Sequence, residues 1–227
     1  MEQTETNKFL VPAAIVVAGA LIAFAVYSGG AKAPAPSGQQ AAADVKIVPV
    51  KNEDHYFGSR SAKVVIVEYS DTECPFCKVY HNSLNQIMRD YDGKVAWVYR
   101  HLPIPQLHAK ATKEAEATEC VAELGGNTAF WQYLDKIFET TNSNDSLDPA
   151  QLPILAKSVG IGEAAFNSCL SSGKYTEAVQ ASATEGFASG ARGTPFSLIM
   201  IDGKQVGTIN GAEPLVSVKA KLDALLK

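Results

Sequence analysis

Two cysteines between a continuously apolar segment and an amphipathic one constrain this chain more than any other feature. Residues 64–69 (VVIVEY) are almost all apolar, which is typical of a strand that is covered on both faces. A Cys-Pro-Phe-Cys motif follows at positions 74–77, and apolar residues then recur at helical spacing as far as Tyr91. The sequence therefore predicts a buried strand, a cysteine pair at a helix start and an amphipathic helix, in that order.

The rest of the folded part alternates between strand-like and helix-like patterns. The turn signal Asp92-Gly93 and a strand-like run at 95–99 complete a βαβ unit with parallel strands, and residues 45–50 are expected to form a short first strand. The helices that we expect after this unit span residues 108–124, 128–139, 149–160, 163–170 and 175–188. Strands at 196–201 and 205–209, joined at Asp202-Gly203, and a helix at 214–226 follow. This order predicts an α/β or α+β domain with helices inserted at its middle.

The N-terminal region has a different composition. Residues 9–27 contain no charged side chain, and as a helix they would span roughly 28 Å, close to the thickness of a bilayer core. We expect a short tail at 1–8, a transmembrane anchor at 9–27, a flexible linker rich in Gly, Ala and Pro at 28–44, and a folded domain at 45–227. A cleaved signal peptide and a buried core helix are the alternatives to the anchor.

Charge excludes one class of partner. The chain has 20 Lys and Arg against 24 Asp and Glu, which gives a net charge of −4, and it has no basic cluster. Such a chain lacks the positive charge that nucleic-acid binding requires, so no nucleic-acid partner is expected.

The position of the cysteine pair predicts its chemistry. Cys74 would stand at the amino end of a helix, where unpaired N–H groups and the helix dipole favour its thiolate. The thiolate is the nucleophile of disulfide exchange, so Cys74 is predicted to attack and Cys77 to resolve. Half of a zinc site and a plain structural pair are the alternatives. Zinc needs more ligands, and neither a second CxxC nor a histidine pair at ligand spacing is present, so no metal is expected.

These motifs resemble those of a known family. Residues 68–77 (EYSDTECPFC) and 193–196 (GTPF), with the helical insertion, resemble DsbA-like thiol–disulfide oxidoreductases of the thioredoxin superfamily. The resemblance covers residues 45–227 and implies a thioredoxin fold with a helical subdomain at about 107–190. It also implies a cis peptide bond before Pro195, with Thr194 and Pro195 lying against the active-site sulfurs. Without the resemblance, an ordinary trans proline at the start of an edge strand is the simpler interpretation.

Two further positions acquire auxiliary roles from the same resemblance. Glu68 matches a buried acid beneath the disulfide, which could relay a proton to or from Cys77; a strand-end acid facing solvent is the alternative. Between the cysteines stand Pro75 and Phe76, whereas strong oxidants of this type commonly have His before the second cysteine. Phe76 cannot supply a cation to the thiolate, so the direction of the redox reaction is left open.

The second pair of cysteines is expected to have a structural role. Cys120 and Cys169, if joined, would close a loop of about 50 residues and contribute roughly 4 kcal/mol; free buried thiols are the alternative. Two disulfides would indicate an oxidising compartment, so the domain is expected outside the cytoplasm. Among the other ring side chains, His81 is expected to face solvent, and Trp97 and Trp131 to lie in the core. His55, His101 and His108 show no ligand spacing.

We therefore expect an enzyme without a cofactor, a membrane-tethered thiol–disulfide oxidoreductase acting on cysteine-containing proteins. The family resemblance implies a membrane-bound redox partner. A disulfide reductase or isomerase on the same fold, and a non-enzymatic thiol metal-carrier, are the alternatives.

Overall fold

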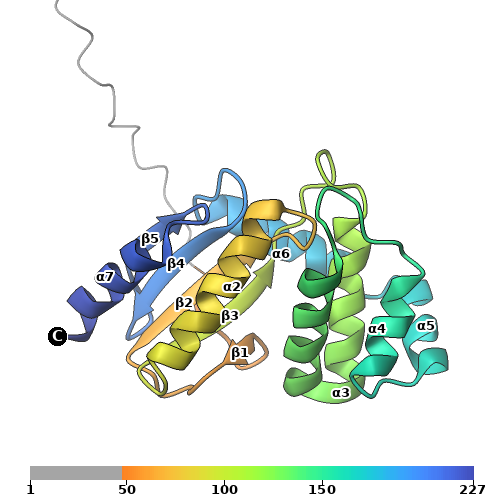
Figure 1. The fold of residues 1–227 in the computed structure, drawn as a ribbon, viewed down its shortest axis with the longest axis horizontal. Coiled ribbons are helices and arrows are strands. Elements are labelled where there is room, and N and C mark those ends of the chain that lie inside the picture. The colour runs from red at the N-terminus through yellow and green to blue at the C-terminus, as the bar shows by residue number, and fades with distance from the viewer. Residues whose placement is uncertain (1–47) are drawn as a thin grey trace, which may run out of the picture. The chain divides into compact units, whose positions relative to one another are not determined.

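A computed structural model describes residues 48–227, which form a five-stranded mixed sheet with helices on both faces (Figure 1). The strands lie in the order β1-β3-β2-β4-β5. They span His55–Phe57 (β1), Val64–Ser70 (β2), Val95–His101 (β3), Phe196–Ile201 (β4) and Lys204–Asn210 (β5). The helices span Pro75–Asp90 (α2), Ala111–Thr140 (α3), Gln151–Ser158 (α4), Glu163–Ser172 (α5), Thr176–Ala188 (α6) and Leu215–Leu226 (α7).

The predicted βαβ unit is confirmed. β2 and β3 pair in parallel, with Val64 opposite Val95, and α2 connects them. The predicted hairpin is also confirmed, because β4 and β5 pair antiparallel on either side of Asp202-Gly203. The prediction of a first strand at 45–50 is wrong for its described part: residues 48–50 are not in a strand, and the first strand is β1.

The two faces of the sheet pack against different helices. On one face, α2 and α7 contribute Tyr80, Leu84 and Leu222 to a core that includes Trp97 of β3. On the other face, α6 packs closely through Gly186, where an added Cβ atom would stand 2.8 Å from the Tyr69 ring. Burial of β2 and β3 on both faces explains their continuous apolar sequences.

The helical insertion is confirmed between β3 and β4, and it has a core of its own (Figure 1). α3 contains the two helices that the sequence predicts, because Gly126 interrupts it with a positive φ of 75°. That conformation is accessible to glycine without a steric penalty. The second half of α3 also reaches the sheet, where Phe130 and Trp131 enter the main core. The insertion is therefore packed against the sheet through α3.

The predicted tail, anchor and linker lie at 1–44, outside the residues that the structure describes. Within residues 48–227, none of the helices combines the length and the apolar character that crossing a bilayer requires.

Candidate active site

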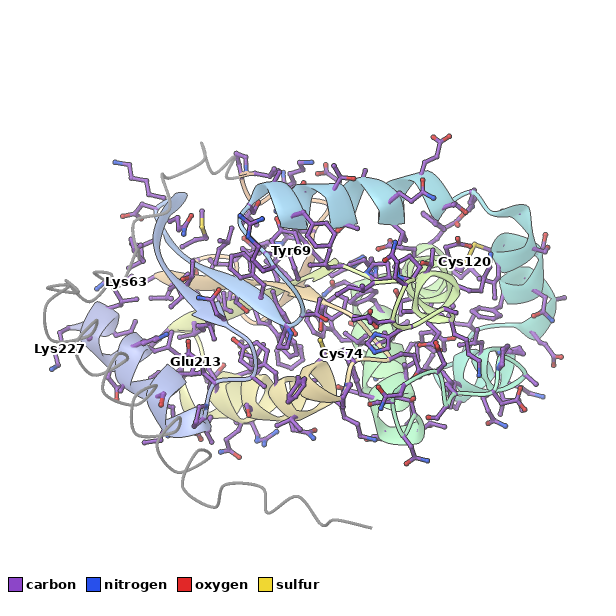
Figure 2. All side chains as sticks on the ribbon, turned by 90° about the horizontal axis from the view of Figure 1, so that it is seen from above. Lys63, Tyr69, Cys74, Cys120, Glu213 and Lys227 are labelled. Carbon is purple, nitrogen blue, oxygen red and sulfur yellow. A yellow bond between two sulfur atoms is a disulfide. The ribbon has the colours of Figure 1, made fainter. Side chains whose placement is uncertain are left out.

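The Cys-Pro-Phe-Cys motif lies at the junction of sheet and helix. Cys74 is the N-cap residue of α2, with extended φ and ψ angles of −77° and 122°, and Pro75 begins the helix. Proline is well suited to this position because its missing N–H would have no partner inside the helix. Figure 2 shows Cys74 at the start of α2. Cys77, one turn further, is fully buried, while Cys74 is 5 % exposed.

The pKa values of the two thiols are shifted in opposite directions. The pKa of Cys74 is lowered to about 6, chiefly by hydrogen bonding from the Cys77 thiol, and the backbone N–H groups of Phe76 and Cys77 add to the effect against the opposing influence of burial. Burial raises the pKa of Cys77 well above its usual range, and the neighbouring Cys74 and Glu68 raise it further. At neutral pH the pair therefore holds one thiolate, on Cys74, and one thiol, on Cys77.

The segment before β4 closes over the outer sulfur. The Thr194–Pro195 peptide bond is cis. Sγ of Cys74 lies 3.5 Å from the carbonyl oxygen of Thr194, to which it donates when it is protonated. Thr194 and Pro195 thus lie beside Cys74, at the place that the family resemblance implies.

Glu68 lies beneath the cysteine pair and is fully buried on β2, so it does not face solvent. Its Oε2 accepts a hydrogen bond from the indole Nε1 of Trp97 at 2.9 Å. Burial raises the pKa of Glu68 to about 8, against the opposing hydrogen bonds from Ser70 and Trp97. The carboxyl group is therefore mostly protonated at pH 7 and holds a proton near Cys77.

The outer surface of the motif is apolar. The side chain of Phe76 is 64 % exposed. Neither Pro75 nor Phe76 brings a charge to the motif, so the lowered pKa of Cys74 rests on hydrogen bonds from the Cys77 thiol, from Thr194 and from the backbone of Cys77 and Phe76.

A set of buried polar residues around the site was not predicted. Asp71 accepts from the Ile104 N–H at 2.8 Å and is paired with Nδ1 of His108 at 3.0 Å, and its own N–H donates to the Cys77 sulfur at 3.4 Å. Asp71 and the neighbouring Cys74 raise the pKa of His108, although burial opposes them. The raised pKa favours the protonated, positively charged form of His108 near the cysteine pair.

Two further buried acids tie the loop before Cys74 to the helical insertion. Glu73 accepts hydrogen bonds from the Leu147 N–H at 3.1 Å and the Thr141 hydroxyl at 3.0 Å. Glu114 of α3 accepts from the Thr72 hydroxyl at 2.6 Å, and burial raises its pKa to about 8. The acidic run immediately before the motif was the available sequence signal for these contacts.

Cys120 and Cys169 form a disulfide with an S–S distance of 2.01 Å, which joins α3 to α5. Figure 2 shows Cys120 within the insertion, well away from Cys74. The bridge is therefore spatially separate from the reactive pair.

The histidines differ from their expected surroundings. The prediction that His81 faces solvent is wrong, because it is 2 % exposed and its Nε2 lies 2.6 Å from the Asp135 carboxylate. His55 and His101, which show no ligand spacing in the sequence, both contact the carboxylate of Glu119. Trp97 and Trp131 are buried, as predicted.

Comparison with known proteins gives a family match over most of the chain. Residues 51–218 match the family described as Thioredoxin. Among solved structures, DsbA2 of Pseudomonas aeruginosa is 27 % identical, with a TM-score of 0.65 over 79 % of this chain and 97 % of that one. Oxidised BdbD of Bacillus subtilis is 22 % identical, with a TM-score of 0.68 over 78 % of this chain and 95 % of that one.

The curated relatives are much longer proteins. A Na(+)/H(+) antiporter, NhaA 3 of Salinispora tropica, is 40 % identical over 107 residues, which are 47 % of this chain and 15 % of that protein. The matched part spans only 13 to 15 % of the length of the first such relatives. The similarity therefore concerns a small part of each antiporter, and ion transport is not inferred from it.

Proposed function

Because the chain belongs to the thioredoxin family, we propose that it is a thiol–disulfide oxidoreductase that exchanges disulfides with cysteine-containing proteins through Cys74 and Cys77. One observation carries the proposal: the two thiols of the pair have opposite acidities, with a pKa of about 6 for Cys74 and a strongly raised pKa for the buried Cys77. Two-step exchange requires an outer sulfur that is a leaving group of low pKa and an inner, buried partner; Cys74 is 5 % exposed and Cys77 is fully buried.

In the proposed reaction a thiolate of the client protein attacks the Cys74 sulfur of the oxidised pair. The Cys74–Cys77 bond breaks, and the Cys77 sulfur leaves with the electron pair and takes a proton, which Glu68 is placed to supply. A second client thiolate then attacks the client sulfur of the mixed disulfide, and Cys74 leaves as a thiolate. The client gains one disulfide, and the enzyme is left as a dithiol.

Stabilisation of the Cys74 thiolate favours this direction. A protein whose reduced form is stabilised transfers its disulfide to other proteins readily. The lowered pKa of Cys74 stabilises the reduced form, so it supports oxidation of clients rather than their reduction. A reductase or isomerase on the same fold is the second candidate, favoured by Phe76, which brings no positive charge between the cysteines. A thiol metal-carrier is the non-enzymatic candidate.

Single substitutions in the pair test the mechanism. Cys74→Ser is expected to abolish oxidation of a reduced, unfolded substrate protein, and Cys77→Ser to accumulate mixed disulfides that are visible on non-reducing gels. A variant lacking Cys120 and Cys169 serves as the control, because it loses two cysteines outside the site and is expected to keep the activity. Full activity in Cys74→Ser would refute the proposed mechanism.

The reduction potential separates the candidate reactions. A value nearer about −120 mV than about −270 mV would support an oxidase, and the reverse would support a reductase. Tight metal binding by the reduced pair, without disulfide exchange, would support the metal-carrier instead.

We further propose that the domain works outside the cytoplasm, tethered by residues 9–27 and reoxidised by a membrane-bound partner. The Cys120–Cys169 disulfide supports an oxidising compartment, and the uncharged segment supports the tether. Protease treatment of intact cells should digest the domain, and alkaline washing should leave the full chain in the membrane fraction. Release of the chain by the wash would contradict the tether.

A further inference from the structure

A second group of reactive side chains lies apart from the cysteine pair, where β1, β3 and α3 meet. β1 and β3 pair antiparallel with His55 opposite Tyr99, so His55 and His101 are diagonal neighbours on one face of the sheet. Glu119 of α3 covers that face and contacts both rings. The fold thus gathers three side chains from separate elements at one point.

The donor atoms of this group converge. Nε2 of His55 lies 2.9 Å, and Nε2 of His101 lies 2.8 Å, from the same oxygen, Oε1 of Glu119. All three ligand atoms lie within 4.8 Å of one another. In a tetrahedral zinc site, with bonds of about 2.0–2.1 Å, ligand atoms are about 3.3 Å apart. Small side-chain shifts would therefore place the three atoms around one ion.

The rings are held in these orientations by their neighbours. The His55 ring stacks on Phe130 with centroids 3.6 Å apart and an angle of 8° between the planes. The His101 ring is 4 % exposed in its side chain and packs edge-on against Tyr99 and Phe130. Ligands that are already oriented lose little side-chain entropy when an ion binds.

The group also has an opening to solvent and a favourable charge environment. A cavity of about 350 Å³ is lined by His55, His101 and Glu119. Its wall adds the carboxylates of Glu53, Asp54 and Glu185 to that of Glu119, against the basic side chains of Lys51 and Arg100. An excess of carboxylates favours entry of a cation, and the cavity leaves room for water in the remaining coordination position.

We propose that His55, His101 and Glu119 form a three-ligand site for a divalent transition-metal ion such as Zn²⁺, with the remaining position open to water. Two imidazoles and one carboxylate are ligands that Zn²⁺ takes with an open position, whereas Ca²⁺ prefers an all-oxygen set. The bound ion would tie the sheet, through β1 and β3, to α3 of the insertion. This proposal is independent of the thiol chemistry at Cys74.

The test is a Zn²⁺ titration of the full chain by calorimetry, with Cys74 and Cys77 oxidised to a disulfide so that their thiols do not bind the ion. We expect one equivalent to bind, with weaker or undetectable Ca²⁺ binding. His101→Gln and the isosteric Glu119→Gln should each weaken Zn²⁺ binding by at least about 10-fold. His81→Gln removes another buried histidine paired with a carboxylate, and it should leave the affinity unchanged.

Two further readouts distinguish a metal site from a hydrogen-bonded cluster. Zn²⁺ should raise the unfolding temperature of the unmodified chain and of His81→Gln but not that of Glu119→Gln, because only a ligand bound to the folded state stabilises it. Bound Cu²⁺ should show nitrogen coupling from two imidazoles in its electron paramagnetic resonance spectrum. Absence of stoichiometric Zn²⁺ binding, an unchanged affinity in a folded Glu119→Gln variant, or preference for Ca²⁺ would overturn the proposal.

Discussion

The reduction potential of the Cys74–Cys77 couple should change its dependence on pH near pH 6. Below that value both sulfurs of the reduced pair are protonated, so two protons accompany two electrons and the potential falls by about 59 mV per pH unit. Above it, Cys74 stays ionised because its pKa is about 6, while the buried Cys77 keeps its proton. One proton then accompanies two electrons, and the slope becomes about 30 mV per pH unit.

The size of the effect at pH 7 follows from the same acidity. With a pKa of about 6, roughly 90 % of Cys74 is ionised at pH 7, against a few per cent for an ordinary thiol. At one pH unit above the pKa, ionisation of Cys74 stabilises the reduced form by about 1.4 kcal/mol relative to a thiol that stays protonated. Screening by solvent at this partly accessible sulfur reduces the figure to about 1 kcal/mol. That is about 20 mV of added oxidising power.

The sign follows from linkage. The pKa of Cys74 is depressed in the folded reduced protein, so its contribution to stability is complete above the unfolded thiol pKa and is lost as the pH falls through about 6. The stability of the reduced form relative to the oxidised form should therefore be lower at pH 5 than at pH 8.

Equilibration with glutathione between pH 4 and pH 9 measures the slope, and thiolate absorbance at 240 nm measures the Cys74 ionisation directly. Glu68, with a pKa of about 8, also titrates in this range, so the series is repeated in Glu68→Gln, where the break near pH 6 should persist. A slope of about 59 mV per unit continuing to pH 8 would refute the assignment of a thiolate to Cys74.

Three other outcomes are expected. Replacing Cys120 and Cys169 together by Ala should lower the free energy of unfolding by about 4 kcal/mol and the melting temperature by roughly 8–16 °C, since the bridge closes a loop with a sequence separation of 49; calorimetry checks this, and an unchanged melting point contradicts it. Glu68→Gln should slow formation of the mixed disulfide at least about tenfold, because the buried group that protonates the departing Cys77 sulfur is lost; quenched-flow gels measure the rate, and an unaltered rate excludes the relay. His108→Gln should raise the pKa of Cys74 above about 6, because the charged forms of His108 and Cys74 favour each other, as followed at 240 nm; a constant value would show that His108 does not act on the sulfur.

Patterns that depend on neighbouring residues could be predicted from the sequence. A continuous apolar run located β2, helical spacing of apolar residues located α2, and the Asp202-Gly203 turn between two strand-like runs located the β4–β5 hairpin. β1 was missed because its sequence, HYF, is too short to show alternation, and it exists only through its pairing with β3.

Features that depend on tertiary contacts could not be predicted in the same way. His81 stands on α2, after the cysteine motif, but its buried contact is with Asp135 of α3, which is 54 positions away. His55, His101 and Glu119 are brought together by strand pairing and by the packing of α3. Their spacing in the sequence therefore gives no indication that they lie close together. Of the residues around Cys74, the Cys-Pro-Phe-Cys motif could be identified in the sequence. The place of His108 could not, because it depends on the tertiary contact with Asp71.

Cys77 is completely buried and Cys74 is barely accessible, so the two sulfurs differ in their access to other molecules. In the proposed exchange a client protein can therefore form a bond to Cys74 only. Attack by the buried Cys77 sulfur limits the lifetime of that mixed disulfide. A client without a second thiol is released unchanged when the Cys77 thiolate attacks the Cys74 sulfur, the client thiolate leaves and the Cys74–Cys77 disulfide forms again. Burial of the Cys77 sulfur thus limits the lifetime of mixed disulfides with unsuitable proteins, without any recognition of their sequence.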